Sequence, residues 1–259
     1  MGQPMFEPTR MQILTAPHPT HRLDSRDVDL GPAGVYRLFT ALPKAEAAAG
    51  WPSLWLLDGN AAFDRLAPDL LSRHPGLAVV GVGYPTDMPF DTTRRALDYT
   101  PPPLRPDPKR PERMVGGAGD FLPRLTGPLR DAVESGGHFD PNRRMLAGHS
   151  YGGLCAIHAM SGDSGFARFA AISPALWLAE DLTPPPGLPL SVIVGDRERE
   201  RGAVADPEKP HHCVPAQAES FVIRAGAQGR DVRLHILPGA DHGATLAEAQ
   251  PLLMAQAQQ

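Results

Sequence analysis

The sequence has few cysteines: only Cys155 and Cys213 occur among its 259 residues. Two cysteines cannot build the disulfide framework of a small secreted domain, and their separation fits no zinc-ligand pattern. We therefore expect two free thiols in a reducing compartment and no bound metal.

The sequence also lacks long apolar runs and any large excess of charge. No stretch approaches the roughly 18 apolar residues of a membrane-spanning helix, and the N-terminal residues lack the apolar core of a signal peptide. The 25 basic and 29 acidic residues leave a net charge of −4, which gives no electrostatic reason to expect nucleic acid as a partner. These absences favour a soluble, cytoplasmic protein that binds neither membranes nor nucleic acid.

The composition itself is that of a globular protein. Apolar residues make up 42% of the chain and charged residues 21%, a balance that rules out disorder throughout. The 26 glycines and 30 prolines predict many turns and structured loops. Because no linker or internal repeat divides the sequence, we predict one domain over residues 1–259 with a substantial core.

Short apolar runs alternate with segments of helical periodicity. The runs suit buried parallel strands, and the segments between them suit amphipathic helices. This alternation predicts an α/β fold with a mainly parallel central sheet and helices on both faces. We expect strands near 35–42, 53–57, 77–82, 144–147, 190–194 and 232–236, and helices over 63–71, 152–160, 218–225 and 245–255, with breaks at Pro68 and Pro251.

Residues 101–113 are irregular. Prolines and charges alternate there (PPPLRPDPKRPER), which argues against a helix or a central strand. The segment is either a surface loop or a cap over a site, since long loops in compact domains are often functional.

A candidate nucleophile stands in a G-x-S-x-G pentapeptide, with Ser150 between Gly148 and Gly152. Apolar residues that suit a strand precede it and residues that suit a helix follow it, which is the strand–turn–helix arrangement of a nucleophile elbow. The sharp turn projects the serine, and the two glycines remove side chains that would collide there. An ordinary glycine-rich turn is the alternative.

A serine hydroxyl is a weak nucleophile until a base takes its proton. In this arrangement the base follows the last strand, where His242 stands, and the acid precedes it in the chain. The acid should follow the strand near 190–194 and would fix the tautomer of the histidine and stabilise its imidazolium form. Glu198 is our first choice and Asp196 the second, and Glu200 also stands there; a solvated charged loop is the alternative.

Acyl transfer also needs two hydrogen-bond donors for the developing oxyanion. The main-chain N–H of Tyr151, directly after the serine, is one candidate. The second should come from the loop after the strand near 53–57, where Gly59 lets the backbone approach closely. A plain β-to-α turn with Asn60 as the helix N-cap is compatible with this role.

Five segments together resemble the esterase D-like branch of the α/β-hydrolases, and most closely its siderophore trilactone esterases. The resemblance runs over roughly residues 30–250 and implies the α/β-hydrolase fold. It is less specific for the substrate, because feruloyl and acetylxylan esterases and S-formylglutathione hydrolases are relatives. The segments are LLDGN at 56–60, VGYP at 82–85, RALDYTP at 95–101, AGHSYGG at 147–153 and ISPA at 172–175.

The resemblance implies roles for individual residues. Ser150 and His242 would be nucleophile and base, and Gly59 and Tyr151 the oxyanion donors. Arg95 matches an arginine that lies by the substrate, where a cation suits a catecholate or carboxylate group. An ion pair between this arginine and Asp98 is the alternative, and some members work with a Ser–His dyad that lacks a clear acid.

The resemblance therefore implies a serine esterase without a cofactor. Its substrate would be a small-molecule ester, most specifically the trilactone of a catecholate siderophore, which could be iron-loaded and opened in the cytoplasm to release the metal. A general short-chain or aromatic carboxylesterase is the second hypothesis. An acyltransferase and a ligand-binding protein that keeps the fold without its chemistry are two further hypotheses.

Overall fold

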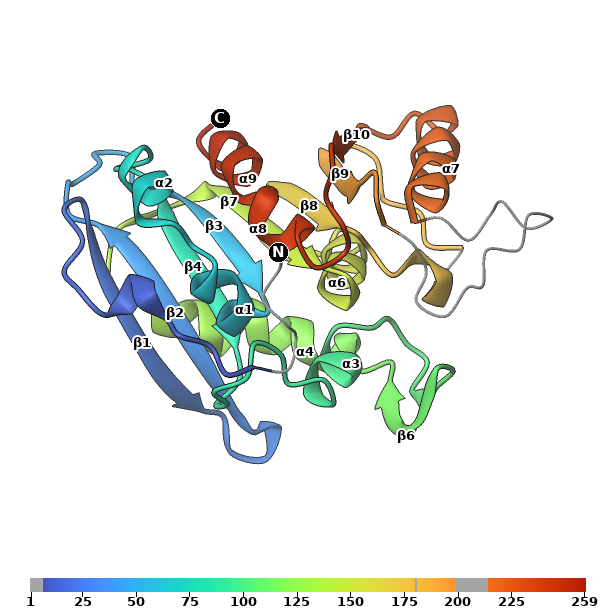
Figure 1. Ribbon diagram of the computed structural model, residues 1–259, viewed down its shortest axis with the longest axis horizontal. Helices are drawn as coiled ribbons and strands as arrows, with labels where there is room; N and C mark the ends of the chain where they lie inside the picture. Colours follow the sequence, from blue (N-terminus) through green and yellow to red (C-terminus); the bar gives the residue numbers. More distant parts are fainter. Residues whose placement is uncertain (1–6, 180, 199–213) are drawn as a thin grey trace.

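The computed structural model describes residues 7–179, 181–198 and 214–259, so Glu200 and Cys213 lie outside the described residues. Its main feature is an eight-stranded sheet in the order β1-β2-β4-β3-β7-β8-β9-β10 (Figure 1). β1 and β2 are antiparallel, as are β2 and β4, whereas every other neighbouring pair is parallel. The strands are β1 (His21–Asp29), β2 (Val35–Pro43), β3 (Trp51–Leu57), β4 (Ala78–Gly83), β7 (Phe139–His149), β8 (Arg168–Ile172), β9 (Leu190–Gly195) and β10 (Val232–Leu237).

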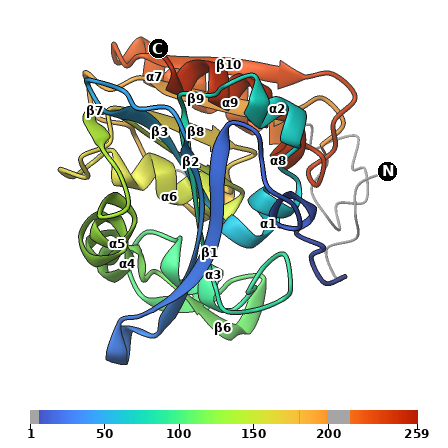
Figure 2. The ribbon, with the colours of Figure 1, turned by 90° about the vertical axis from the view of Figure 1, so that its left-hand side faces the viewer.

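Helices cover both faces of this sheet (Figure 2). Phe63, Leu71 and Leu253 belong to one apolar cluster and bring α1, α2 and α9 onto one face. Phe121 and Leu154 belong to the other cluster, together with residues of α3, α5 and α7. The helices are α1 (Gly59–Asp64), α2 (Pro68–Ser72), α3 (Arg94–Asp98), α4 (Ala118–Arg124), α5 (Arg130–Glu134), α6 (Tyr151–Ala159), α7 (Val214–Ala227), α8 (Thr245–Glu248) and α9 (Gln250–Ala257), with short turns of other helix types at η1 (Gln12–Leu14), η2 (Gly31–Ala33), η3 (Leu125–Leu129) and η4 (Leu176–Leu178).

The α/β sheet and the central strands agree with the sequence pattern. β3, β4 and β9 are buried along their whole lengths, as expected of apolar runs in a parallel sheet. The predicted breaks also occur: Pro68 begins α2 and Pro251 lies in the first turn of α9, where a missing N–H costs nothing. Within the described part of the chain, no helix is long and apolar enough to cross a membrane.

Two strands of the sheet have no clear sequence signal. β1 is polar (HRLDSRDVD), because it is the edge strand and most of its residues are exposed. β8 is only five residues long and contains two alanines, which have low strand propensity. Its position in the sheet comes from pairing with β7 and β9 rather than from local preference.

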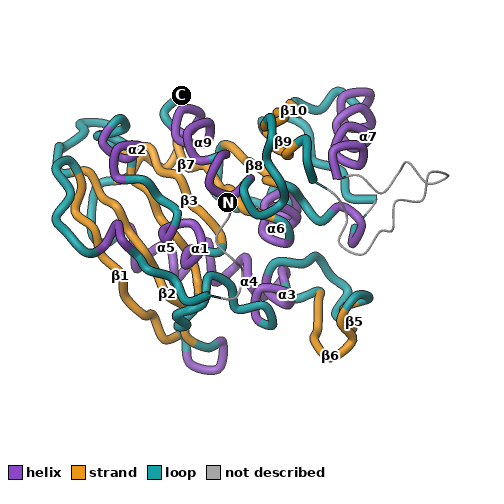
Figure 3. Tube along the Cα trace, viewed as in Figure 1, coloured by secondary structure: helices purple, strands orange, loops and turns teal. Residues whose placement is uncertain are grey.

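Residues 101–113 are not the irregular loop that their prolines suggest. Most of the segment belongs to a second, two-stranded sheet formed by β5 (Arg105–Asp107) and β6 (Arg110–Val115) (Figure 3). Pro106 and Pro111 are tolerated because both strands of a two-stranded sheet are edge strands. A proline, which has no N–H, can there face the side without a neighbouring strand. The segment is therefore a hairpin, and it lies apart from the main sheet (Figure 1).

The parallel strands bring distant residues to one edge of the sheet. β3, β7, β8, β9 and β10 run in the same direction, so the residues that follow their last positions meet at their carboxyl ends. Those residues include Asp58, Ser150, Ser173, Glu198 and His242. This edge is where open α/β sheets bind their ligands.

Candidate active site

Ser150 lies in a strained turn between β7 and α6. Its φ and ψ are 58° and −112°, a conformation that costs energy for a residue with a side chain. A Cβ on Gly148 would lie 2.3 Å from the carbonyl of Gly152, so the turn can close only with glycine there. The main-chain N–H of Ser150 donates to the carbonyl of Ile172 at 2.8 Å, which fixes the turn against β8. This is the geometry of a nucleophile elbow.

His242 contacts a buried carboxylate. Its Nδ1 lies 2.7 Å from Oε2 of Glu198, whose side chain is fully buried, while the histidine side chain is 37% exposed. A carboxylate accepts hydrogen bonds, so Nδ1 carries the proton and Nε2 keeps a free lone pair. The exposed imidazole is therefore in the tautomer that a general base requires.

The second oxygen of Glu198 is held by residues to which sequence reasoning gave no role. Oε1 accepts hydrogen bonds from Oγ of Ser173 at 2.5 Å and from the N–H of Gly195 at 2.7 Å. Ser173 also contacts the hydroxyl of Thr245 at 2.9 Å. Ser173 stands in the ISPA segment that carried part of the family resemblance, which was the available signal for its importance.

His149 ties the elbow to the loop that carries His242. Its Nε2 lies 2.7 Å from the main-chain carbonyl of His242, and the two imidazole rings lie 4.6 Å apart. Burial, followed by the neighbouring His242 and Arg95, lowers the pKa of His149 well below its usual value. The neutral ring must then donate from Nε2, since a carbonyl can only accept.

Asp196, the second candidate acid, and Asp241, the neighbour of His242 in sequence, both accept hydrogen bonds from other groups. Oδ1 of Asp196 accepts the N–H of Gly239 at 2.6 Å, and Asp241 accepts the N–H groups of Gly243 and Ala244. Among the described acidic candidates, Glu198 is thus the one that contacts His242. Glu200 lies outside the described residues.

The turn between β3 and α1 packs directly against the elbow. A Cβ on Gly152 would lie 3.4 Å from Cβ of Leu57 and 3.5 Å from Oδ2 of Asp58. Gly59 and Tyr151 begin α1 and α6, and the first N–H groups of a helix have no acceptor within it. The helices α1 and α6 therefore do not use these two N–H groups themselves, and the turns that carry them are in contact.

The expectation that Asn60 caps α1 is wrong. The N-cap is Asp58, and Asn60 lies one residue inside the helix. The Asn60 amide instead bonds the chain after β4, accepting from the N–H of Tyr84 and donating to the carbonyls of Tyr84 and Thr86. It fixes α1 to β4, where a Cβ on Gly59 would lie 2.7 Å from the carbonyl carbon of Gly81.

Arg95 lies at this edge, but its ion pair is not with Asp98. Its Nε and Nη2 each donate to one oxygen of Asp58, both at 2.8 Å. Asp98 accepts hydrogen bonds from Tyr36 and Tyr84 instead. Arg95 and Asp98 are three residues apart in α3, a spacing at which side chains can meet. Each instead bonds a residue from another part of the chain, so sequence proximity was a poor guide to pairing.

The hairpin β5–β6 reaches the elbow through Tyr151. The tyrosine hydroxyl donates to Oδ2 of Asp107 at 2.9 Å and accepts from Nη2 of Arg113 at 3.0 Å. At the tip, Nζ of Lys109 lies 3.9 Å from the ring centroid of Trp177 in η4. The segment 101–113 thus lies beside the candidate nucleophile.

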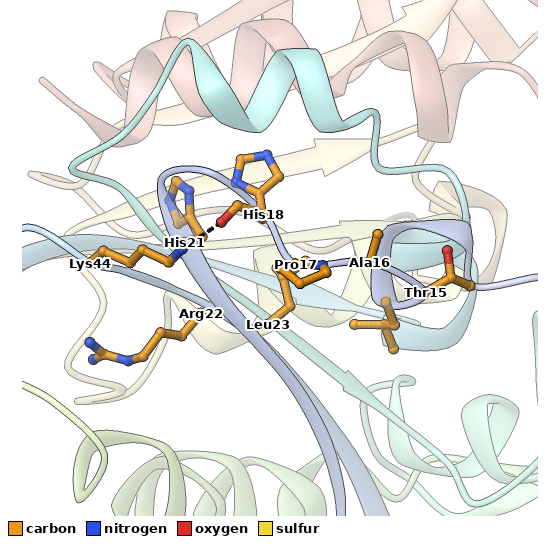
Figure 4. Close-up of a pocket in the computed structure, with 9 residues that line it drawn as sticks. Thr15, Ala16, Pro17, His18, His21, Arg22, Leu23 and Lys44 are labelled. Carbon is orange, nitrogen blue, oxygen red and sulfur yellow. Dashed lines mark hydrogen bonds between the residues drawn. The ribbon is translucent and has the colours of Figure 1, made fainter.

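Three other features could have had a chemical role outside this candidate active site: a cysteine, a set of metal ligands and a separate cavity. Burial raises the pKa of the Cys155 thiol, which suits a packed side chain inside α6 rather than a nucleophile. Within the described residues, no group of three His, Cys, Asp or Glu side chains could hold a metal ion. A cavity of about 410 Å³ lies near His18, His21 and Lys44, and none of the catalytic candidates lines it (Figure 4).

The chain is similar in sequence to curated siderophore esterases. No protein-family model matches the chain. The apo-salmochelin esterase of Escherichia coli is 40% identical over 149 residues, which cover 54% of this chain and 47% of the relative. The siderophore enterobactin esterase of Emericella nidulans is 34% identical over 166 residues, covering 56% and 54%. The chain therefore spans about half the length of the curated relatives that it matches.

A solved structure extends the likeness to nearly the whole chain. The enterobactin hydrolase IroE in complex with DFP superposes with a TM-score of 0.74 at 28% identity, covering 94% of this chain and 98% of that one. The chain has the α/β-hydrolase fold. Its resemblance to the siderophore esterases is confirmed at the level of sequence and of structure.

Proposed function

We propose that the protein is a serine esterase that cleaves carboxylic esters through an acyl-enzyme on Ser150. The observation that carries the proposal is the 2.7 Å contact between His242 and the buried Glu198, at the same sheet edge as a serine with a φ of 58°. The arrangement supplies a nucleophile, a base and an acid in the chain order of α/β-hydrolases.

In the first half of the reaction, Nε2 of His242 takes the hydroxyl proton of Ser150 while Oγ attacks the ester carbonyl carbon. The carbonyl oxygen becomes an oxyanion, which the main-chain N–H groups of Gly59 and Tyr151 stabilise. Glu198 stabilises the imidazolium that forms. The bond to the alcohol then breaks, and His242 returns the proton to the leaving oxygen.

In the second half, water attacks the acyl-enzyme. His242 takes a proton from the water, and a second oxyanion forms at the same two N–H groups. When it collapses, the acid leaves and the proton returns to Oγ of Ser150. If an alcohol attacked the acyl-enzyme in place of water, the product would be a new ester and the protein would be an acyltransferase.

As the substrate, we propose a trilactone siderophore of the catecholate type, free or iron-loaded. Three observations support it: the names of the two curated relatives, the enterobactin hydrolase among the solved structures, and the five motif segments in their family order. A trilactone contains three ester bonds between hydroxy-acid units, so the same site could cleave them one after another.

The experiment incubates the protein with an enterobactin-type trilactone, with and without iron, and identifies products by mass spectrometry. Linear trimer, dimer or monomer should appear with the intact protein and not with Ser150→Ala. The comparison with iron shows which form is preferred.

Other outcomes identify the alternatives. Turnover of p-nitrophenyl acetate without trilactone cleavage would leave a general carboxylesterase. Binding of the trilactone without turnover of either ester would indicate a ligand-binding protein with this fold. The cytoplasmic location expected from the sequence stays a prediction, which cell fractionation tests.

A further inference from the structure

Arg95 and Asp58 form a buried ion pair between the two turns that carry the proposed oxyanion donors. The Asp58 side chain is fully buried and that of Arg95 is 10% exposed. Two parallel hydrogen bonds of 2.8 Å join Nε and Nη2 of the arginine to the two carboxylate oxygens. Such a forked pair fixes orientation as well as distance, which a lysine could not do.

The same guanidinium also holds the elbow. Nη2 of Arg95 donates to the main-chain carbonyl of His149 at 3.0 Å, in the peptide that leads into Ser150. Its guanidinium carbon lies 5.3 Å from the ring centroid of Tyr151. One side chain therefore bonds both turns that carry the proposed oxyanion donors, since Asp58 precedes Gly59 and His149 is two residues before Tyr151.

The backbone of Asp58 needs such support. Its φ and ψ are 55° and 48°, in the left-handed region, which aspartate adopts more often than most non-glycine residues but still uncommonly. Burying an ion pair also carries a desolvation cost that the attraction between the charges often fails to exceed. The Asp58–Arg95 pair is thus better explained by a role in fixing the position of this turn than by a contribution to the stability of the fold.

We infer that Asp58 and Arg95 are positioning residues that set the separation between the main-chain N–H groups of Gly59 and Tyr151. The inference deepens the proposed esterase function and rests on it. An oxyanion hole needs donors about 2.7–3.1 Å from the developing charge, so the turns that carry Gly59 and Tyr151 have to keep a fixed separation. We call the Asp58–Arg95 pair the clamp. It acts on every ester, whatever the charge of the acyl group.

This role differs measurably from substrate binding by Arg95. A cation that contacts an anionic substrate contributes mainly to KM, and only for substrates that carry the charge. A clamp on the oxyanion donors contributes to kcat, because those donors bind the transition state more tightly than the ground state. A small neutral ester therefore separates the two roles.

The experiment compares Arg95→Lys, which keeps the charge and loses the fork, with Asp58→Asn, which keeps the shape and loses the charge. kcat and KM are measured with p-nitrophenyl acetate and with the trilactone, and kcat is normalised to the folded fraction from near-ultraviolet circular dichroism. We expect kcat to fall about 10- to 100-fold for both esters in both variants, with KM changed less than about 3-fold.

Arg144→Lys is the matched control. Arg144 makes a forked pair of the same kind with Glu134, at two distances of 2.7 Å, in the middle of β7 and five residues before His149. Its replacement should lower stability and leave kcat unchanged. Ser150→Ala run in parallel must lose both activities; if it does not, the proposed function fails and the clamp fails with it.

A different pattern overturns the clamp alone. If Ser150→Ala is inactive but Arg95→Lys and Asp58→Asn keep the wild-type kcat on p-nitrophenyl acetate, the pair does not position the donors. A rise in KM for the trilactone only would then assign Arg95 to substrate binding. Equal losses of kcat in Arg144→Lys would show a general effect of destabilisation and would also overturn the inference.

Discussion

Glu198 is the residue on which the proposed chemistry most depends after Ser150 and His242. Among the described residues, its two oxygens accept from His242, Ser173 and the N–H of Gly195, all within 2.7 Å. Contacts on both oxygens fix the orientation of the carboxylate. The histidine is therefore held in a single tautomer before any substrate arrives.

Glu198→Gln should lower kcat for p-nitrophenyl acetate by about 10²- to 10⁴-fold while KM changes little. The amide of glutamine can donate to Nδ1, which would move the proton of His242 to Nε2 and remove the base. Steady-state kinetics checks the loss.

Asp196→Asn is the matched control, because Asp196 follows the same strand but accepts from Gly239. It should keep kcat within about 3-fold of wild type. A larger effect of Asp196→Asn than of Glu198→Gln would place the acid elsewhere or favour a Ser–His dyad.

The sequence located these residues only in part. The pentapeptide around Ser150 and the position of His242 after the last strand are local patterns, and both lie where the patterns predict. Three acidic residues stand at alternate positions after β9, so choosing among them required the fold. Ser173 and the Asp58–Arg95 pair depend on contacts between strands and helices far apart in the chain, which no spacing reveals.

At the scale of elements, the hairpin β5–β6 is the part of the structure that the sequence described least well. Proline-rich composition predicted an irregular segment, yet an ion pair joins the two strands of the ribbon. Nε of Arg113 donates to the buried Asp107 at 2.7 Å, and the same carboxylate accepts from Tyr151 of the elbow. Charge pairing and one tyrosine hydroxyl thus order a segment with little apolar surface.

Asp107→Asn should lower the free energy of unfolding by about 1–3 kcal/mol, because it leaves buried donors poorly satisfied. Amide hydrogens of Arg110–Val115 should also exchange faster. Chemical denaturation and hydrogen exchange measured by mass spectrometry check the two effects.

Asp27→Asn serves for comparison, since Asp27 pairs with Arg37 at an exposed position. Its effect should stay within about 1 kcal/mol. Unchanged exchange across the hairpin in Asp107→Asn would show that the ribbon does not depend on its contact with the elbow.

At the scale of the whole molecule, the alternation of apolar runs and amphipathic segments was enough to predict the sheet. It could not predict the strand order, because that order is set by long-range pairing. It also missed β1, whose polar residues gain their partners only at the edge of the sheet beside β2. β1 begins at His21, which is buried and bonds the carbonyl of Leu77 at 3.0 Å.

His21 should make global stability depend on pH. Burial, opposed in part by the bond to Leu77, lowers its pKa from 6.5 to about 4. Between these values the unfolded chain binds more protons than the folded one, so the free energy of unfolding falls as the pH drops from 6.5 to 4. The slope from one such group is at most about 1.4 kcal/mol per pH unit.

His21→Gln should therefore flatten the pH dependence of unfolding over this interval, measured by urea denaturation at a series of pH values. Above the interval the curves of the variant and the wild type should run parallel. Curves that stay parallel within the interval from pH 6.5 to 4 as well would contradict the buried, neutral state of His21.

The central claim is that Ser150 is the nucleophile of an α/β-hydrolase, and covalent labelling tests it most directly. The protein is treated with DFP, an organophosphate that phosphorylates activated serines, and the modified peptide is identified by mass spectrometry. We predict one adduct per chain, on Ser150, its absence in Ser150→Ala and its much slower formation in Glu198→Gln. An adduct on another residue, or esterase activity that survives in Ser150→Ala, would contradict the account.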